Sequence, residues 1–402
     1  MHIRTRTTRL VVAAAAALTV IAPALLQPAV AAPSPGFYDT PSGLSKLKPG
    51  AVIRKEAESQ FLPTLDGFST AYRIMYRSTG QLGQPVAVGG MVFVPKGKAP
   101  RGGWPIVAWD HGTSGVGDLC NPSRSSDMYD GGQWDLYADQ IDNLLKQGYV
   151  VTASDYEGLG TAGLHTYLLT DALGRATIDA VRAARIVVSS TSAKWAAIGH
   201  SEGGQAALGA GELAATYGKG LSYVGAVGYA PSQHLEDGVL AIASDKFAAP
   251  YLAYMAVGMR SIDPSFEYSR FVGPLYADRM TDAEIHCFDE WFYLDNLGVN
   301  PTPENALNPN WASDATVQRY LDLGVVGQRP GAAPILVLQG TGDGLYSTYP
   351  QFLADICATG TKVHGITYPN ISHDHVLPQG AADAYAWLAD RFAGKPAPND
   401  CA

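Results

Sequence analysis

The sequence predicts an α/β fold in which a mostly parallel sheet is covered by helices on both faces, with a helical cap inserted late in the chain. Short apolar runs alternate with segments that carry apolar residues at helical spacing, the pattern of crossover units in a parallel sheet. This alternation stops over 232–329, which is rich in aromatic residues and methionine. With 47% hydrophobic and 16% charged residues among 402, the chain has enough apolar content for a large core.

The first 31 residues are expected to be a secretory signal peptide. Three arginines within the first nine residues precede an apolar run over 10–26, and small residues follow as far as Ala31. Pro23 interrupts the apolar run, which favours a cleaved signal over a membrane anchor. Since no later stretch is apolar enough to span a bilayer, we expect an exported protein without stable membrane insertion.

The charge of the mature chain limits its partners. Without the three leader arginines, 25 of the 28 basic residues remain against 37 acidic ones, a formal charge of −12. This balance argues against nucleic acid and anionic membrane surfaces as partners. The sequence carries no sign of the oligomeric state.

Four cysteines in an exported chain predict two disulfides, with three possible pairings. They are Cys120, Cys287, Cys357 and Cys401. Their irregular spacing does not match a zinc site.

The expected elements follow one another along the chain. A hairpin pairs 69–79 with 85–95 around the turn "GQLGQ". Further strands are expected at 105–110, 149–156, 194–199, 223–231, 333–341 and 362–369, and helices at 141–148, 173–189, 203–217, 349–360 and 379–394. Residues 32–231 and 330–402 are therefore expected to form the two parts of the core, and 232–329 the cap between two core strands. Ligands bind such sheets at the carboxyl ends of the strands.

The segment "GHSEG" at 199–203 places Ser201 between an apolar strand and a helix. The G-x-S-x-G pattern in this context is the nucleophile elbow of an α/β-hydrolase core. Side chains at the flanking positions would clash in the strained turn, which explains the two glycines. The strand–turn–helix context favours a nucleophile over a structural serine.

A nucleophilic serine of this fold needs an acid and a histidine later in the chain, in that order. Asp343 follows a strand and a glycine-rich turn, although it is also placed to cap the helix near Tyr349. His373 and His375 both lie before the last helix, and His373 is nearer to the strand end. A metal site at these histidines is disfavoured because clear further ligands are missing nearby.

The tetrahedral intermediate needs hydrogen-bond donors aimed at its oxyanion. The backbone N–H of Glu202, directly after the nucleophile, is one candidate. The second is expected in "AWDHGTSG", from the N–H of Thr113 or Gly112, with Asp110 as an alternative. His111 is expected to be structural.

These segments together resemble the secretory lipase family. The matching motifs are "YRIMYRST", "GGMVFVP", "WDHGT", "CNPS", "DYEGLG", "GHSEGG", "GTGDGLY" and "CATGTKVHGITYPNISH". The resemblance implies an α/β-hydrolase core with a large helical cap, His373 as the base, and no cofactor. It also implies the disulfides Cys120–Cys287 and Cys357–Cys401. Glu202 departs from the glycine of the yeast enzymes, so the oxyanion geometry is expected to differ.

The sequence thus predicts a secreted serine hydrolase that cleaves carboxylic esters, as a triacylglycerol lipase or carboxylesterase, through an acyl-enzyme on Ser201, His373 and Asp343. It is expected to use no metal. A serine peptidase of the same fold is the alternative, although the acidic site that would bind a substrate amine is not evident. A non-catalytic binding protein would be expected to have a broken triad.

Overall fold

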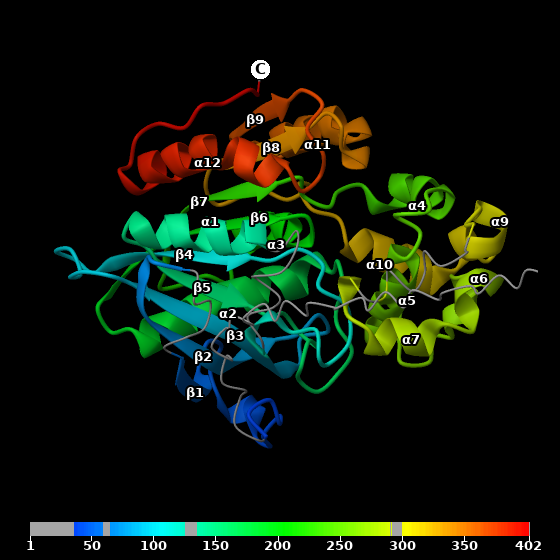
Figure 1. Cartoon of the computed structure of the whole chain (residues 1–402), viewed down its shortest axis with the longest axis horizontal. Helices are drawn as coiled ribbons and strands as arrows, with labels where there is room; N and C mark the ends of the chain where they lie inside the picture. The colour runs from blue at the N-terminus through cyan, green and yellow to red at the C-terminus, as the bar shows by residue number, and fades with distance from the viewer. Residues whose placement is uncertain (1–35, 59–64, 125–134, 290, 292–299, 402) are drawn as a thin grey trace, which may run out of the picture.

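The computed structural model describes residues 36–58, 65–124, 135–289, 291 and 300–401, so the expected leader lies outside the described residues. These residues contain one nine-stranded sheet of order β1-β2-β3-β5-β4-β6-β7-β8-β9 (Figure 1). Its strands are β1 (Val52–Glu58), β2 (Phe68–Thr79), β3 (Pro85–Pro95), β4 (Trp104–Asp110), β5 (Val150–Ser154), β6 (Thr191–His200), β7 (Ser222–Tyr229), β8 (Ile335–Gly340) and β9 (Val363–Tyr368). The first three strands and the β3–β5 pair are antiparallel, and the pairs from β5 to β9 are parallel. The α/β prediction is confirmed; β1 was not among the expected strands.

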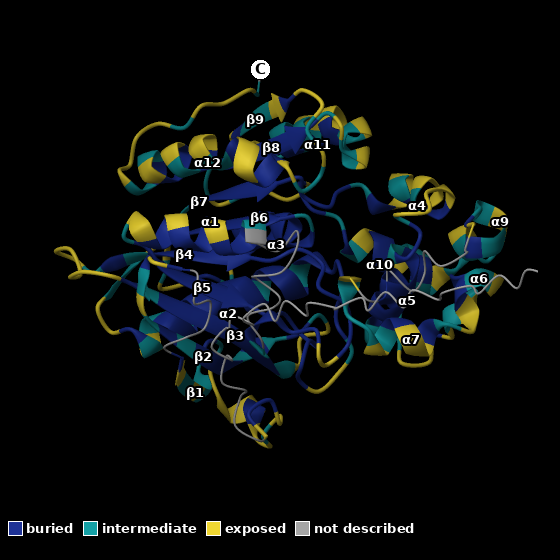
Figure 2. Ribbon diagram, in the orientation of Figure 1, coloured by how far each residue is buried: buried dark blue, intermediate teal, exposed yellow. Residues whose placement is uncertain are grey.

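Helices cover both faces of the sheet. They are α1 (Asp135–Lys146), α2 (Thr170–Val187), α3 (Glu202–Leu213), α11 (Tyr349–Ala358) and α12 (Val376–Phe392). On β4, Ile106 and Ala108 pack in one core cluster with α2, α3 and α11, and the alternating Val107 and Trp109 pack in the other with α1 and α12. Figure 2 shows the sheet buried between these layers.

The helices between β7 and β8 form a group to one side of the sheet (Figure 1). They are α4 (Leu235–Ser244), α5 (Tyr251–Ile262), α6 (Pro274–Ala277), α7 (Met280–Ile285), α9 (Pro303–Ala306) and α10 (Ala315–Leu323). Short 3₁₀ helices complete the structure: η1 (Leu44–Lys46), η2 (Pro122–Arg124), η5 (Tyr268–Arg270), η6 (Trp311–Ser313) and η7 (Gly344–Ser347). The helical group has its own apolar core, to which Tyr167 and Leu169 of the loop between β5 and α2 contribute. The division into a cap at 232–329 and two core parts stays a prediction.

Two disulfides fix segments that are distant in the sequence. Cys120, in the loop after β4, is joined to Cys287 beyond α7, and Cys357 of α11 is joined to Cys401 near the C-terminus. These are the pairings that the family resemblance implied. Among the described helices, none has both the length and the apolar character needed to cross a membrane.

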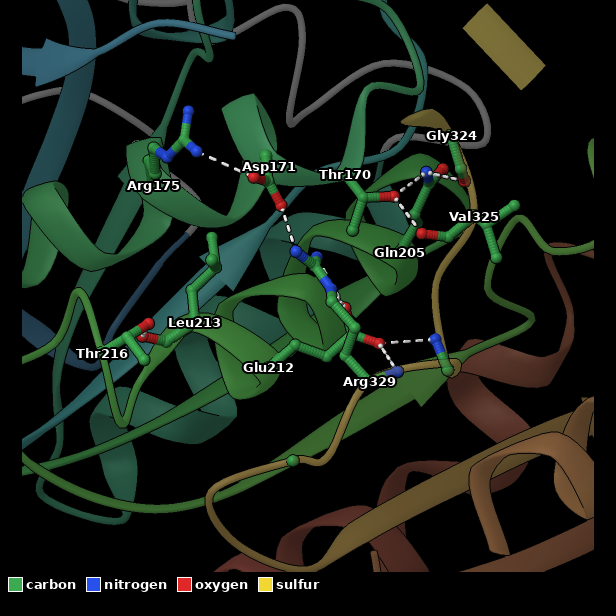
Figure 3. A network of polar contacts seen from close by, with 12 residues as sticks. Thr170, Asp171, Arg175, Gln205, Glu212, Leu213, Thr216, Gly324, Val325 and Arg329 are labelled. Carbon is green, nitrogen blue, oxygen red and sulfur yellow. Dashed lines mark hydrogen bonds and ion pairs between the residues drawn. The ribbon is translucent and has the colours of Figure 1, made fainter. Parts of the chain in front are cut away.

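An ion-pair cluster holds the chain where it returns from α10 to the sheet (Figure 3). The guanidinium of Arg329 lies 2.7 Å from Asp171 of α2 and 2.7 Å from Glu212 of α3. Glu212 also accepts a hydrogen bond of 2.7 Å from the backbone of Gly327, and its side chain is 3% exposed. A carboxylate this buried depends on its cationic partner.

Replacing Arg329 with methionine leaves the buried Glu212 carboxylate without its cation. We expect Arg329→Met to lower the free energy of unfolding by about 2 kcal/mol, below the full cost of breaking a buried pair because the arginine is half-exposed. Urea denaturation measures this change, and the double variant Arg329→Met/Glu212→Gln should recover part of the loss. Equal unfolding midpoints for Arg329→Met and wild type would contradict the role of this cluster.

Candidate active site

Ser201 occupies a strained turn between β6 and α3. Its φ of 58° lies in the left-handed region, which β-carbon-bearing residues rarely adopt. The turn is held by a 2.9 Å hydrogen bond from the Ser201 N–H to the Tyr229 carbonyl, and by a 3.1 Å bond from the Gln205 N–H to the Ser201 carbonyl. The neighbouring strand and the first turn of α3 therefore stabilise a conformation that the residue alone disfavours.

The two flanking glycines are needed for close packing of this turn. A β-carbon on Gly203 would lie less than 3.0 Å from the carbonyl oxygen of Asp110 at the end of β4. A β-carbon on Gly199 would meet the carbonyl oxygen of Gly203 in the same way. Both obstacles are backbone atoms, which cannot rotate away as a side chain can. The structure thus explains why glycines lie two residues before and two residues after Ser201.

Asp343 and His373 come together at the ends of β8 and β9. His373 Nδ1 lies 2.8 Å from Asp343 Oδ2 and donates its hydrogen to that carboxylate. The other Asp343 oxygen accepts the N–H of Leu345 at 3.0 Å, and Gln339 donates to Oδ2 at 2.7 Å. With its carboxylate held by three donors, Asp343 fixes the histidine tautomer and leaves His373 Nε2 as the nitrogen with a free lone pair.

The pKa values of this pair are shifted by each other. Burial alone would lower the pKa of His373, but the adjacent Asp343 carboxylate outweighs it and raises the net pKa above 6.5. Burial raises the pKa of Asp343, but His373 and the hydrogen bonds from Leu345 and Gln339 outweigh burial and lower it. An ionised carboxylate beside a basic imidazole suits the orienting acid and base of a serine nucleophile.

Ser201, Asp343 and His373 line one cavity of about 640 Å³. Much of its wall is apolar and comes from the helical insertion and the loops beside it: Leu235, Ile242, Phe247, Tyr251, Met255 and Phe288. Among the described residues, no hydrogen bond joins the Ser201 hydroxyl to the His373 ring, whereas the His373–Asp343 bond is formed. Serine–histidine bonds are often long before substrate binds, so this geometry is compatible with a nucleophile–base pair.

His375 has a different environment from His373. Its side chain is exposed, and its Nδ1 lies 2.9 Å from the Ser372 hydroxyl. It is not part of the cavity wall. The contact with Asp343 thus belongs to His373.

The candidate oxyanion residues occupy different positions. Thr113 lines the cavity, and its hydroxyl is 2.8 Å from that of Tyr167. The Gly112 N–H donates to the Tyr137 hydroxyl at 3.1 Å, so it is already used. Asp110 is buried below the turn, where it accepts a hydrogen bond from Thr177, and burial raises its pKa to about 8. Of the three alternatives in this loop, Thr113 has the best access to a substrate.

Glu202 begins α3, and its side chain is 1% exposed. One carboxylate oxygen lies 3.0 Å from Nε2 of His165, which comes from the loop before α2. The side chain is not part of the cavity wall. His111 is also buried, donates from Nδ1 to the Gly112 carbonyl at 2.7 Å, and has its pKa lowered to about 4 by burial, which agrees with a structural role.

His200, His373 and Asp374 have potential ligand atoms within 4.8 Å of one another. However, His200 Nε2 faces the carbonyl oxygen of His373 at 3.0 Å and must donate a hydrogen to it. A nitrogen that carries a hydrogen has no lone pair for a metal. This cluster therefore does not have the chemistry of a formed metal site.

A mostly parallel sheet with a serine at a left-handed strand-to-helix turn is the architecture of the α/β-hydrolases. A family model described as secretory lipase matches residues 132–400, which is more than half of the chain. The chain therefore belongs to the secretory lipase family, whose substrates are esters and lipids. Membership in this family identifies a secreted protein, in agreement with the two disulfides.

Two relatives and one solved structure illustrate the range of similar proteins. A probable inactive lipase of Mycobacterium tuberculosis is 25% identical over 382 residues, covering 90% of this chain and 82% of that protein. A probable trichothecene esterase of Stachybotrys chartarum is 28% identical over 273 residues, covering 63% of this chain and 54% of that protein. Candida antarctica lipase A in its closed state superposes with a TM-score of 0.76 at 20% identity, covering 91% of this chain and 87% of that one.

The close packing at Gly203 makes a stability prediction. We expect Gly203→Ala to destabilise the protein by about 3 kcal/mol, because overpacking against backbone typically costs this much. The matched control is Gly238→Ala on α4, where the added β-carbon meets nothing closer than Ile242 Cδ1 at 3.7 Å. That control should be stabilising by about 0.5–1 kcal/mol, as expected for glycine-to-alanine changes in a helix. Chemical denaturation compares the two variants, and equal shifts would refute the packing argument.

Proposed function

We propose that the chain is a secreted carboxylic-ester hydrolase with Ser201 as nucleophile, His373 as general base and Asp343 as the orienting acid. The observation that carries this proposal is that the three side chains line one cavity while His373 Nδ1 donates to Asp343 at 2.8 Å. The serine lies on an elbow with a positive φ, and the glycines on either side of it let the strand and the helix approach closely, as in the turn that exposes a nucleophile.

The reaction proceeds in two halves. Ser201 Oγ attacks the ester carbonyl carbon while His373 Nε2 takes its proton, and Asp343 stabilises the imidazolium. The backbone N–H groups of Glu202 and Thr113 receive the oxyanion. When the tetrahedral intermediate collapses, the C–O bond to the alcohol breaks and His373 protonates the leaving oxygen. His373 then deprotonates a water molecule that attacks the acyl-enzyme carbonyl carbon. When the second tetrahedral intermediate collapses, the bond to Ser201 Oγ breaks, His373 returns the proton to Oγ, and the carboxylic acid is released.

The cavity wall favours a neutral substrate with an apolar acyl group. Its apolar side chains include Met255 and Phe288, and Phe247 is 73% exposed at the same cavity. Burial of each acyl methylene against such a wall contributes about 0.8 kcal/mol. A lipase and an esterase both fit this wall, and they differ in how long an acyl chain is bound.

A peptidase function is the second candidate because, among the described residues, three carboxylates besides Asp343 lie on the cavity wall, those of Asp237, Asp245 and Asp374. Asp245 Oδ1 already accepts the backbone N–H of Phe247 at 2.7 Å. Asp237 is 70% exposed and lies 3.6 Å from His234. The side chain of Asp374 is 34% exposed and lies 4.0 Å from His200 Nε2. None of the three carboxylates forms a buried, unpaired site for a substrate amine, so ester hydrolysis is favoured.

Removing the Ser201 hydroxyl should abolish the activity. We expect Ser201→Ala to lower kcat toward p-nitrophenyl butyrate by at least about 10⁴-fold with a normal unfolding midpoint, because the nucleophile is lost while the fold is kept. Ser313→Ala, an exposed serine on the insertion, is the control and should retain full activity. Since one relative is a probable inactive lipase, wild-type turnover is measured first.

A substrate panel distinguishes the alternatives with the same variants. Serine-dependent turnover that rises about fourfold per added acyl methylene, and extends to emulsified triglyceride, identifies a lipase. Turnover restricted to short acyl groups identifies an esterase, and turnover of aminoacyl p-nitroanilides with none of the esters supports the peptidase. Absence of all three activities, together with no labelling of Ser201 by a fluorophosphonate, would refute the catalytic proposal.

The His373–Asp343 pair predicts the pH dependence. His373 must be neutral to accept a proton, and its pKa is raised above 6.5, so kcat/KM should fall as the pH drops through a pKa above 6.5. In Asp343→Asn the carboxylate that raises the pKa of His373 is lost, while the burial that lowers this pKa remains. The low-pH limb of the kcat/KM profile should therefore move to lower pH, while kcat falls by about 10⁴-fold. In Asp374→Asn, which removes a weaker raising charge, the limb should move slightly to lower pH with kcat nearly unchanged. A limb at the same pH in all three proteins would show that His373 is not the titrating base.

A further inference from the structure

A chain of buried hydrogen bonds connects the loop after β4 with the loop that carries His373. The Gly112 N–H lies 3.1 Å from the Tyr137 hydroxyl on α1. That hydroxyl lies 2.8 Å from Nδ1 of His200, the residue that precedes the nucleophile. His200 Nε2 in turn lies 3.0 Å from the carbonyl oxygen of His373. The side chains of Tyr137 on α1 and His200 at the end of β6 thus connect the loop after β4 with the loop that carries His373.

The direction of this chain is fixed by chemistry. A carbonyl oxygen only accepts, so His200 Nε2 must carry the hydrogen. Burial and the neighbouring His373 lower the pKa of His200 to about 3, so its ring is neutral and Nδ1 has a lone pair. The Tyr137 hydroxyl therefore donates to Nδ1, and its oxygen accepts the Gly112 N–H. In each of the three hydrogen bonds the donor thus lies on the Gly112 side and the acceptor on the His373 side.

The two side chains that form this series of hydrogen bonds are almost fully buried, although both contribute to the cavity wall. Tyr137 is 3% exposed and His200 2%. Gly112 has no side chain, and a β-carbon there would lie less than 3.0 Å from the Tyr137 hydroxyl oxygen. The glycine of "HGT" thus lets the tyrosine approach the backbone. Buried networks in which every donor and acceptor is used rigidify their surroundings.

We propose that Tyr137 and His200 are positioning residues that hold the main chain of His373 at the distance from Ser201 that proton transfer needs. This inference rests on the proposed ester hydrolysis. Asp343 orients the His373 ring through Nδ1, but it does not fix the backbone from which the ring extends. His200 holds this backbone through the hydrogen bond to the His373 carbonyl, and His200 is directly followed by Ser201. His200 therefore holds the backbone of the base and is directly bonded to the nucleophile, so it sets the position of both.

The test separates positioning from stability and from substrate binding. We expect Tyr137→Phe to lower kcat by about 10-fold to 100-fold, because misplacing a base by about 1 Å costs this much. KM should stay within twofold, and the acid limb should not move because the His373–Asp343 pair is intact. Tyr76→Phe is the matched control, since this tyrosine is also fully buried and donates to the Ala176 carbonyl at 3.0 Å. Tyr76→Phe should lower the stability by a similar amount and leave kcat unchanged.

Two further variants examine the link through His200. His200→Gln keeps an N–H donor for the His373 carbonyl and should retain most of kcat, whereas His200→Leu removes it and should match or exceed the loss in Tyr137→Phe. If the tyrosine acts through His200, adding Tyr137→Phe to His200→Leu should cause no further loss of kcat.

Several outcomes would overturn the inference while leaving the proposed function standing. The first is an unchanged kcat in Tyr137→Phe, the second is an equal loss of kcat in His200→Gln and His200→Leu, and the third is an additive loss of kcat in the double variant. Each of these results counts only if the wild-type protein is active and its Ser201 reacts with fluorophosphonate. An inactive, unreactive wild type would instead overturn the proposed function and this inference with it.

Discussion

The contact between Gly203 and the carbonyl oxygen of Asp110 decides how α3 leaves the sheet. Because the helix begins against the end of β4, the chain must reverse within one residue, and Ser201 takes the positive φ that this requires. The same approach brings the loop after β4, with Thr113, to the first turn of α3. A side chain at 203 would separate these two segments, so Ser201, the helix N-terminus and the candidate oxyanion loop all depend on this one backbone contact.

Two adjacent imidazoles show how the surroundings divide chemical roles. The rings of His200 and His373 lie 4.6 Å apart, yet their pKa values move in opposite directions. Burial and the neighbouring His373 lower the pKa of His200 to about 3, although Asp374 lies 4.0 Å from its Nε2, whereas hydrogen-bonded Asp343 raises the pKa of His373 despite its burial. A permanently neutral ring suits a fixed hydrogen-bond donor, and a basic ring suits a group that must accept and return a proton. The carboxylate thus determines which histidine is suited to the chemistry.

Local pattern predicted much of the fold, because the strands from β4 to β9 are short, apolar and separated by amphipathic helices. It also identified Ser201, Asp343 and His373 as candidates, because the elbow motif and the order of residues after the strand ends can be seen in the sequence. β1 was missed because "VIRKEAE" is mostly polar and its partner is the long strand β2. The roles of Tyr137 and His200 depend on tertiary packing: His200 reads as a variable position of the motif, and its acceptor is 173 residues away. No sequence signal marks such a contact.

Glu202, in place of the glycine of the yeast enzymes, led us to expect a different oxyanion geometry, but its side chain is buried away from the cavity. His165 donates from Nδ1 to the Glu157 carbonyl at 2.9 Å, and its Nε2 lies 3.0 Å from one oxygen of the Glu202 carboxylate. The buried carboxylate therefore has a polar partner in the loop before α2. The contact draws the Glu202 side chain away from the cavity and toward the loop before α2. The departure from glycine therefore leaves the backbone N–H of Glu202 available and gives the first residue of α3 an additional anchor.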